Sequence, residues 1–308
     1  MKVKSKAVLG QVSDMDFRLL QVFKSVVECG GMAAAELELN IGISTISRHV
    51  KDLESRLGLT LCIRGRAGFA LTAEGERIYD ETLRLLRSAD AFRASVDDIH
   101  QRMGGQLHIA VFDKTASNPA ARLADAIALF ADQAPDVTLN LHVASINSIE
   151  RGVIDGRFQL GVIPAHRSSE SLIYHILFGE SMLLYCGTRH SLFEADSEQL
   201  DWDDVREYRF AGLGYHSPNM EISQQVRLAR AATGFDQESI ATLILSGKFL
   251  GFLPDHYANG FVLAGAMRAV NPARFRYDCN FVAILRGSPQ PSRAARAFEQ
   301  CLLTAHGG

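Results

Sequence analysis

Polar side chains that can hydrogen-bond to DNA cluster between residues 44 and 66 of this chain. Within six residues stand three hydroxyls, a guanidinium and an imidazole, supplied by Ser44, Thr45, Ser47, Arg48 and His49. Side chains of these types read base edges in the major groove. Arg64 and Arg66 follow at an expected hairpin, from which they would contact phosphates or the minor groove. The segment therefore predicts a double-stranded DNA partner.

Three short helices and a hairpin would position these side chains. Apolar residues recur every three or four positions over residues 14–30 and 44–57, and a short Ala-rich helix is expected over residues 32–39. Two helices joined by a tight turn form either a helix-turn-helix or part of a plain three-helix bundle. The hairpin expected over residues 61–71 favours a winged helix-turn-helix, and we expect a DNA-binding domain over residues 14–72.

The run from Ala33 to Gly75 resembles the N-terminal signature of LysR-type transcriptional regulators. The resemblance rests on the alanines 33–35, Leu39, Ser47-Arg48, Leu53-Glu54, Leu57-Gly58, Leu61, Arg64, Leu71-Thr72 and Gly75. It implies a sequence-specific regulator that a small effector controls, with RNA polymerase as a further partner. The chain departs from the family at Ile43-Ser44, where Gln-Pro is usual. Because Ile43 cannot make the amide contacts that glutamine makes with adenine, the family's operator preference does not carry over.

Residues 73–103 predict a long linker helix with a coiled-coil seam. Apolar residues recur at alternating spacings of four and three, the period of a two-stranded coiled coil. We expect a dimerisation seam that includes Ile78, Leu85, Phe92, Val96 and Ile99. The alternative is a long helix that packs on its own domain. In the resembled family this helix forms the homodimer and effector domains commonly complete a homotetramer, so paired recognition helices would read two half-sites.

Residues 104–308 predict an α/β effector-binding domain. Strands alternate with helices at its start, a pattern typical of a parallel sheet. The expected order is that of bilobed, periplasmic-binding-protein-like sensors, which hold a ligand between two lobes. We expect lobe I over about 105–164 and 265–308, and lobe II over about 165–264. Among the expected elements are a helix opened by Asn118-Pro119, strands near Phe178 and at 182–186, and helices at about 222–232 and 239–246.

Candidate effector-binding residues lie where strands give way to helices or loops. They are Thr115, Ser117 and Asn118 after the first strand, Ser145 and Asn147 after the second, His216 in a later loop, and Phe249. Phe249 belongs to the run Gly247–Pro254, which is similar to a late motif of the resembled family. Hydroxyls at helix N-termini suit a small anion such as a carboxylate. The alternative is that these side chains only cap their helices.

Composition and motifs exclude other classes of protein. Residues 1–72 hold ten Lys and Arg against seven Asp and Glu, whereas the whole chain has a net charge of −3, which favours nucleic acid at one end only. The sequence lacks nucleophile-elbow, phosphate-loop and metal-ligand spacings, which argues against an enzyme and predicts no cofactor. A solute-binding protein would need a secretory signal. We therefore expect a cytoplasmic protein with no membrane partner.

Overall fold

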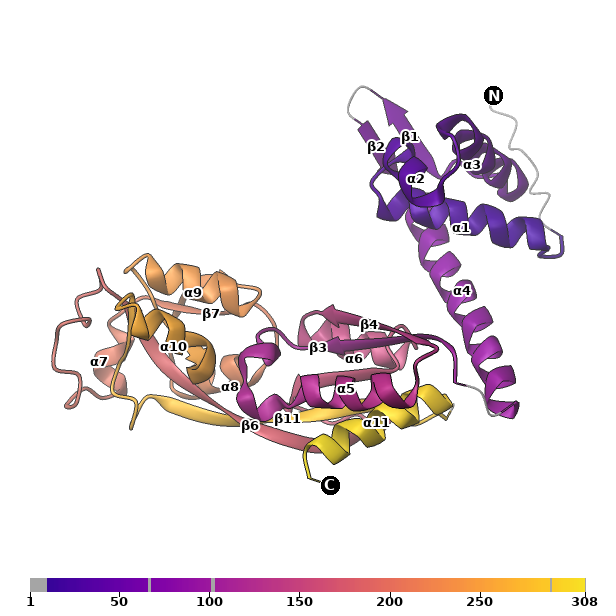
Figure 1. Ribbon diagram of the computed structural model, residues 1–308. Coiled ribbons are helices and arrows are strands. Elements are labelled where there is room, and N and C mark those ends of the chain that lie inside the picture. The colour runs from indigo at the N-terminus through magenta and orange to yellow at the C-terminus, as the bar shows by residue number, and fades with distance from the viewer. Residues whose placement is uncertain (1–9, 66–67, 101–102, 289, 308) are drawn as a thin grey trace. The chain divides into compact units, whose positions relative to one another are not determined.

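The computed structural model describes residues 10–65, 68–100, 103–288 and 290–307 (Figure 1). The chain divides into two compact units, residues 1–93 and 94–308. Each unit has its own hydrophobic core. Among the described residues, no helix combines the length and the apolar character that crossing a membrane requires.

The N-terminal unit is a winged helix-turn-helix. Its elements are α1 (Asp14–Glu28), α2 (Met32–Leu39), α3 (Ile43–Leu57), β1 (Cys62–Gly65), β2 (Gly68–Leu71) and the start of α4 (Ala73–Ile99). The apolar stripes of the helices form the core, in which Phe23, Val26, Ile46 and Val50 are fully buried. β1 and β2 pair antiparallel as the wing. The sequence predicted this order, although α4 ends at Ile99, earlier than residue 103.

Side chains fix where the helices of this unit begin. The carboxylate of Asp16 accepts from the backbone N–H of Ser13 at 2.8 Å and from its hydroxyl at 2.6 Å, at the start of α1. The hydroxyl of Thr72 accepts from the N–H of Gly75 at 2.9 Å and so caps α4. Glu36 of α2 accepts from the N–H of Ile43 at 3.1 Å, at the start of α3. Capping thus ties the recognition helix α3 to α2.

A nine-stranded mixed sheet organises the C-terminal unit, with the order β4-β3-β5-β11-β6-β9-β7-β8 and β10 paired to β6. Its strands are β3 (Gly105–Val111), β4 (Val137–Val143), β5 (Leu160–Pro164), β6 (Leu172–Gly187), β7 (Phe210–Leu213), β8 (Arg230–Gly234), β9 (Leu250–Pro254), β10 (Met267–Ala269) and β11 (Arg276–Arg286). β3 runs parallel to β4 and β5, and β7 runs parallel to β8 and β9. β6 and β11 pair antiparallel along their length and join the two groups.

The two parallel groups of strands define the lobes. Lobe I contains β3, β4 and β5 with α5 (Leu123–Gln133), α6 (Ile146–Ile154) and α11 (Arg293–Ala305). Lobe II contains β7 to β10 with α7 (Trp202–Arg206), α8 (Pro218–Gln225), α9 (Gln237–Leu245) and α10 (Asp255–Leu263). α5 and α11 lie side by side over lobe I, where Phe130 meets Phe298 edge to face (Figure 1). β6 and β11 run through both lobes (Figure 1).

Several expected elements of this unit are corrected. The two expected strands near Phe178 and at 182–186 are parts of one strand, β6, with a register shift between Phe281 and Val282 of β11. The helix expected from Asn118-Pro119 is preceded by two short 3-10 turns, Thr115–Ser117 and Pro119–Ala121, and α5 begins only at Leu123. The helix expected at 222–232 starts and ends earlier, as α8, and β8 follows it.

Candidate DNA-binding surface and effector pocket

The outer face of α3 is polar, as the sequence predicted. Ser44 and Arg48 are exposed, and Thr45 and Ser47 are half-buried on the same helix. The start of α3 carries Ile43, which is 45 % exposed, where a glutamine is usual in the resembled family. Short hydroxyls and an arginine near the N-terminus of an exposed recognition helix match what base readout in the major groove requires.

His49 is the exception on this helix, because the structure buries it. Its exposed fraction is 8 %, and its Nδ1 atom lies inside the unit. His49 follows Ile46 by three residues and precedes Leu53 by four, so it falls on the apolar stripe of α3. The structure therefore does not place His49 on the exposed face of α3 where the sequence analysis had put it.

The predicted wing arginines lie at the limit of what the structure describes. Arg64 belongs to β1, where its backbone pairs with Phe69 of β2. Arg66 lies outside the described residues. The wing itself is anchored by Glu54 of α3, whose carboxylate accepts from the N–H groups of Leu61 at 2.7 Å and Cys62 at 3.2 Å. The hairpin is thus fixed directly to the recognition helix.

A buried ion pair joins α1 to the end of α3. The guanidinium of Arg56 donates two hydrogen bonds to Asp16, one from Nη2 to Oδ2 at 2.8 Å and one from Nε to Oδ1. Asp16 is 1 % exposed. The hydrogen bonds from Arg56 and Ser13 lower the pKa of Asp16 to about 2. This carboxylate therefore holds the recognition helix in place.

Acid should release this ion pair. The folded pKa of Asp16 lies below the value of about 3.9 in unfolded chains, so its stabilisation is complete above that value and disappears as pH falls towards 2. We expect Asp16→Asn to lower the free energy of unfolding at pH 7 by about 1.5–3 kcal/mol. The loss should shrink at pH 3. Urea unfolding at both pH values measures it, and Asp52→Asn on the exposed side of α3 is the control. An equal loss at both values would contradict the assignment.

The predicted seam residues of α4 fall into two groups. Ile78 and Leu85 are half-buried and border a hollow of about 460 Å³ in the N-terminal unit, together with Leu20, Leu53 and Leu57. Phe92, Val96 and Ile99 are 70 %, 38 % and 78 % exposed. Ile78 and Leu85 therefore pack within the N-terminal unit. Phe92, Val96 and Ile99 form an apolar stripe that no other element of the described chain covers.

The polar residues predicted after β3 use their side chains within the protein. Thr115 is 2 % exposed, and its hydroxyl donates to the carbonyl of Phe112 at 2.6 Å. Asn118 accepts from the N–H of Ala120 at 2.9 Å and caps the second 3-10 turn. Ser117 is exposed and lies 3.0 Å from Nδ1 of His256. Ser117 thus contacts lobe II, because His256 belongs to α10.

The other four candidates contact neighbouring side chains, and one of them lies far from the rest. The hydroxyl of Ser145 points to Ser148 at 3.2 Å and does not cap α6. Asn147 accepts from Arg167 at 3.3 Å, and the exposed His216 lies 3.5 Å from Glu221. Phe249 precedes β9, at the end of that strand opposite the cleft, where Arg209 stacks on its ring. The structure therefore does not bring Phe249 to the other six.

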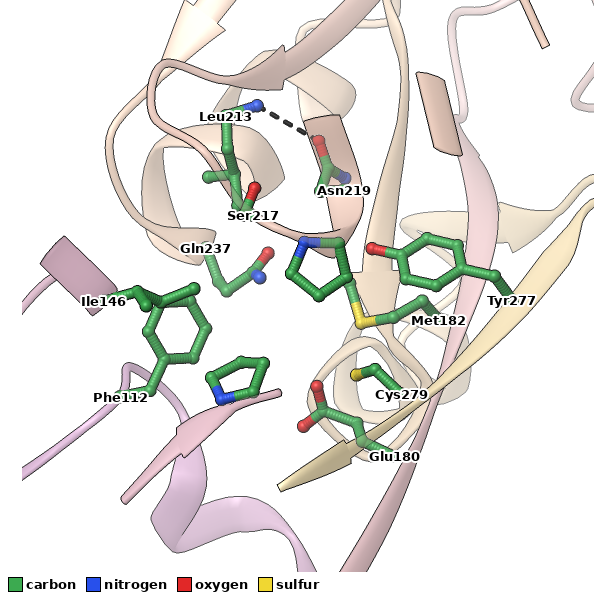
Figure 2. Close-up of a pocket in the computed structure, with 12 residues that line it drawn as sticks. Phe112, Ile146, Glu180, Met182, Leu213, Ser217, Asn219, Gln237, Tyr277 and Cys279 are labelled. Carbon is green, nitrogen blue, oxygen red and sulfur yellow. Dashed lines mark hydrogen bonds between the residues drawn. The ribbon is translucent and has the colours of Figure 1, made fainter. Parts of the chain in front are cut away.

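The structure instead forms a pocket of about 250 Å³ between the lobes (Figure 2). Its walls come from the ends of β3, β5 and β7, the first turns of α6, α8 and α9, and the crossing strands β6 and β11. The lining residues are Phe112, Ile146, Pro164, Glu180, Met182, Leu213, Ser217, Pro218, Asn219, Gln237, Tyr277 and Cys279. None of the seven predicted residues is among them, although Ile146 and Ser217 are their neighbours in the chain. The pocket therefore borders the predicted junctions, but other side chains line it.

Glu180 is the charged side chain of this pocket. It lies on β6, its side chain is 3 % exposed, and Nε2 of His256 approaches its Oε2 at 2.8 Å. Burial raises the pKa of Glu180, and the hydrogen bonds from His256 and Asn118 act against that rise. Its sequence signal was the one acidic residue in the mainly apolar run 172–187. No comparable signal marks Gln237 or Cys279.

Polar contacts join the lobes beside the pocket. Asp113 of lobe I accepts from the backbone N–H of Gln237 at 2.7 Å, at the first turn of α9. Lys114 donates to Glu238 at 2.6 Å and stacks over the ring of Tyr257. All these partners come from α9 and α10. Bonds that cross between lobes depend on how far the lobes are closed.

Comparison with known proteins covers nearly the whole chain. The family model "Bacterial regulatory helix-turn-helix protein, lysR family" matches residues 17–76, and the model "LysR substrate binding domain" matches residues 100–307. The chain is 40 % identical over 290 residues to the HTH-type transcriptional activator BauR of Pseudomonas aeruginosa, covering 94 % of this chain and 95 % of that protein. It is 29 % identical over 245 residues to the probable regulator LrrA of Synechococcus elongatus, covering 78 % and 81 %.

Among solved structures, full-length CbnR in complex with its target DNA is similar, with a TM-score of 0.63. The match covers 94 % of this chain and 99 % of CbnR at 21 % identity. A second crystal structure of CbnR, a LysR family transcriptional regulator, matches with a TM-score of 0.62. At these identities the likeness concerns the fold.

Proposed function

Because this chain belongs to the LysR family of DNA-binding transcriptional regulators, which are not enzymes, we propose that a small carboxylate-bearing effector in its interlobe pocket controls it. The pocket carries this proposal. The first turns of α6, α8 and α9 line it. Ser217 caps α8 and Asp236 caps α9, whereas no side-chain hydrogen bond caps α6. Helix N-termini favour negative charge.

The effector would act by stabilising one arrangement of the lobes. The bonds of Asp113 and Lys114 to α9 already join lobe I to lobe II. A ligand enclosed between the same elements binds the closed arrangement better than an open one. The ligand shifts the equilibrium between the open and the closed arrangement by as much as its affinities for these two arrangements differ. Closure would then change how paired subunits lie on the operator.

We also propose a homodimer that forms through α4, with a tetramer as the complete assembly. The exposed apolar side chains of Phe92, Val96 and Ile99 support the pairing, because a helix that leaves such a stripe uncovered suits a partner helix. Two-fold pairing would present two α3 helices to half-sites of one operator. Since the Pseudomonas aeruginosa relative is named an activator, RNA polymerase is the proposed further partner, and the cytoplasm, where bacterial DNA lies, is the proposed location.

Replacing Arg48 tests base readout by α3. We expect Arg48→Ala to weaken binding to a duplex selected from a random pool by about 1–3 kcal/mol, and to weaken binding to random duplex less. Fluorescence anisotropy at several salt concentrations measures both affinities. Lys51→Ala, on the same exposed face, is the matched control for loss of a charge. A specificity ratio equal in wild type and Arg48→Ala would remove Arg48 from the reading surface.

A further inference from the structure

The charged side chain that lines the interlobe pocket is acidic. The described lining includes the carboxyl group of Glu180 and contains no lysine, arginine or histidine. A second carboxylate, that of Asp113, lies beside the pocket and accepts from the N–H of Gln237 at 2.7 Å. Carboxylates placed this close disfavour a ligand that carries only negative charge. An effector that enters here needs a positive group as well.

Glu180 keeps acceptor capacity for such a group. The hydroxyl of Ser117 donates to the carbonyl of Lys114 at 2.9 Å, so its oxygen accepts from Nδ1–H of His256 at 3.0 Å. Nε2 of the same ring lies 2.8 Å from Oε2 of Glu180. A carboxylate offers about four lone-pair positions. His256 and Asn118 occupy two of these, so at least one position remains for a ligand donor.

Gln237 supplies a second acceptor. It is the first residue of α9 and is 2 % exposed, and its backbone N–H donates to Asp113. The side-chain oxygen Oε1 is buried without a hydrogen-bond partner. A buried polar atom left in this way costs about 1–3 kcal/mol unless a ligand satisfies it. Figure 2 shows Gln237 and Glu180 among the side chains that face the pocket.

Hydrogen-bond donors for a carboxylate lie at α6. This helix of nine residues begins at Ile146, which lines the pocket, and the side chain of Ser145 does not cap it. The N–H groups of a first helical turn have no partner within the helix. The pocket thus combines donors at α6 with acceptors at Glu180 and Gln237.

We propose that the effector is a small zwitterion, an amino-carboxylic acid. Its protonated amine donates to Glu180 and to Oε1 of Gln237, and its carboxylate accepts from the first turn of α6. The inference deepens the proposed function and rests on the interlobe pocket being the effector site. It predicts that neither charged half alone binds as well as the two joined in one molecule.

Matched ligand triplets test the proposal on the full-length protein. Each triplet consists of a linear or α-amino acid of two to five carbons, the same acid without the amine, and the same amine without the acid. We expect at least one amino acid to raise Tm and to bind in isothermal titration, with its two counterparts binding at least about tenfold more weakly. Glu180→Gln should weaken binding of the amino acid by about 10–100-fold, because it removes a hydrogen bond to a charged group. Glu170→Gln, an exposed glutamate outside the pocket, should not.

Gln237→Leu provides a second variant if Glu180→Gln does not fold. It removes the unpartnered oxygen, so we expect the ligand-free protein to be as stable as wild type or more so, while amino-acid affinity falls. If simple carboxylates bind as tightly as the amino acids and with the same affinity in Glu180→Gln, the result would overturn the zwitterion but not the proposal that the pocket binds the effector. If amino acids bind and both Glu180→Gln and Gln237→Leu leave their affinity unchanged, both proposals fail. Failure of all triplets to bind overturns the zwitterion.

Discussion

We expect the substitution Gly75→Ala to disrupt the N-terminal unit. Gly75 lies in the first turn of α4, and an added Cβ would stand 2.1 Å from the carbonyl oxygen of Leu61 and 3.2 Å from its Cα. Leu61 is fully buried in the core, and its carbonyl also accepts from the N–H of Thr72 at 3.0 Å. The neighbour is backbone, so it cannot turn aside as a flexible side chain would. We expect a loss at or above the upper end of the roughly 1–3 kcal/mol typical of overpacking.

The direction of this effect distinguishes packing from helix propensity. Alanine is favoured over glycine in a helix by about 1 kcal/mol, so propensity alone predicts stabilisation. Gly260, within α10, has nothing within 4 Å of its added Cβ, and Gly260→Ala should stabilise the C-terminal unit slightly. Calorimetry of both variants and DNA binding by Gly75→Ala measure the effects. Wild-type stability and DNA binding in Gly75→Ala would contradict the packing of α4 on Leu61.

The fold of the N-terminal unit could be predicted because local patterns agree with the tertiary structure. The stripes of α1 and α3 are regular, and the wing follows directly. His49 was misplaced because its polarity outweighed its position, three residues after Ile46 on the buried stripe. Periodicity is the stronger guide for such a residue.

Long-range pairing explains the differences in the C-terminal unit. β6 could not be recognised as one strand of sixteen residues, because its first part pairs with β11, about a hundred residues later, and its end pairs with β9 and β10. The start of α8 follows from Ser217 and Pro218, an N-cap followed by proline at the first helical position. The cap and the proline outweigh the apolar residues further along the chain, which had favoured a later helix.

The pocket could be located only in part. The strand-to-helix junctions at β3 and α6 border it, as expected for an α/β sheet. Glu180 and Tyr277 come from the middle of crossing strands, and only the tertiary structure brings them to the junctions. A glutamate in an apolar strand was the one sequence feature that could have indicated a polar site there.

Charged residues on the exposed stripe of α4 should convert the protein to monomers. We choose Phe92 and Ile99, which are 70 % and 78 % exposed, because their replacement disturbs no core in the described chain. Leu85 is unsuitable, because it borders the hollow in the N-terminal unit and its replacement would also affect folding. Paired helices would bury both apolar side chains, and two aspartates facing their counterparts would repel each other. We expect Phe92→Asp/Ile99→Asp to sediment as a monomer.

Loss of pairing should reduce operator affinity far more than half-site affinity. Two linked recognition helices make the second contact intramolecular, which strengthens binding by about 10²–10⁴-fold without new contacts. The double variant should therefore lose at least about a hundredfold on a full operator and little on a half-site duplex, as measured by anisotropy. Ser88→Asp adds a charge to the same helix off the seam and should retain dimers. If the double variant remains dimeric in sedimentation, α4 is not the dimer interface. If it is monomeric and keeps operator affinity, pairing does not contribute to operator binding.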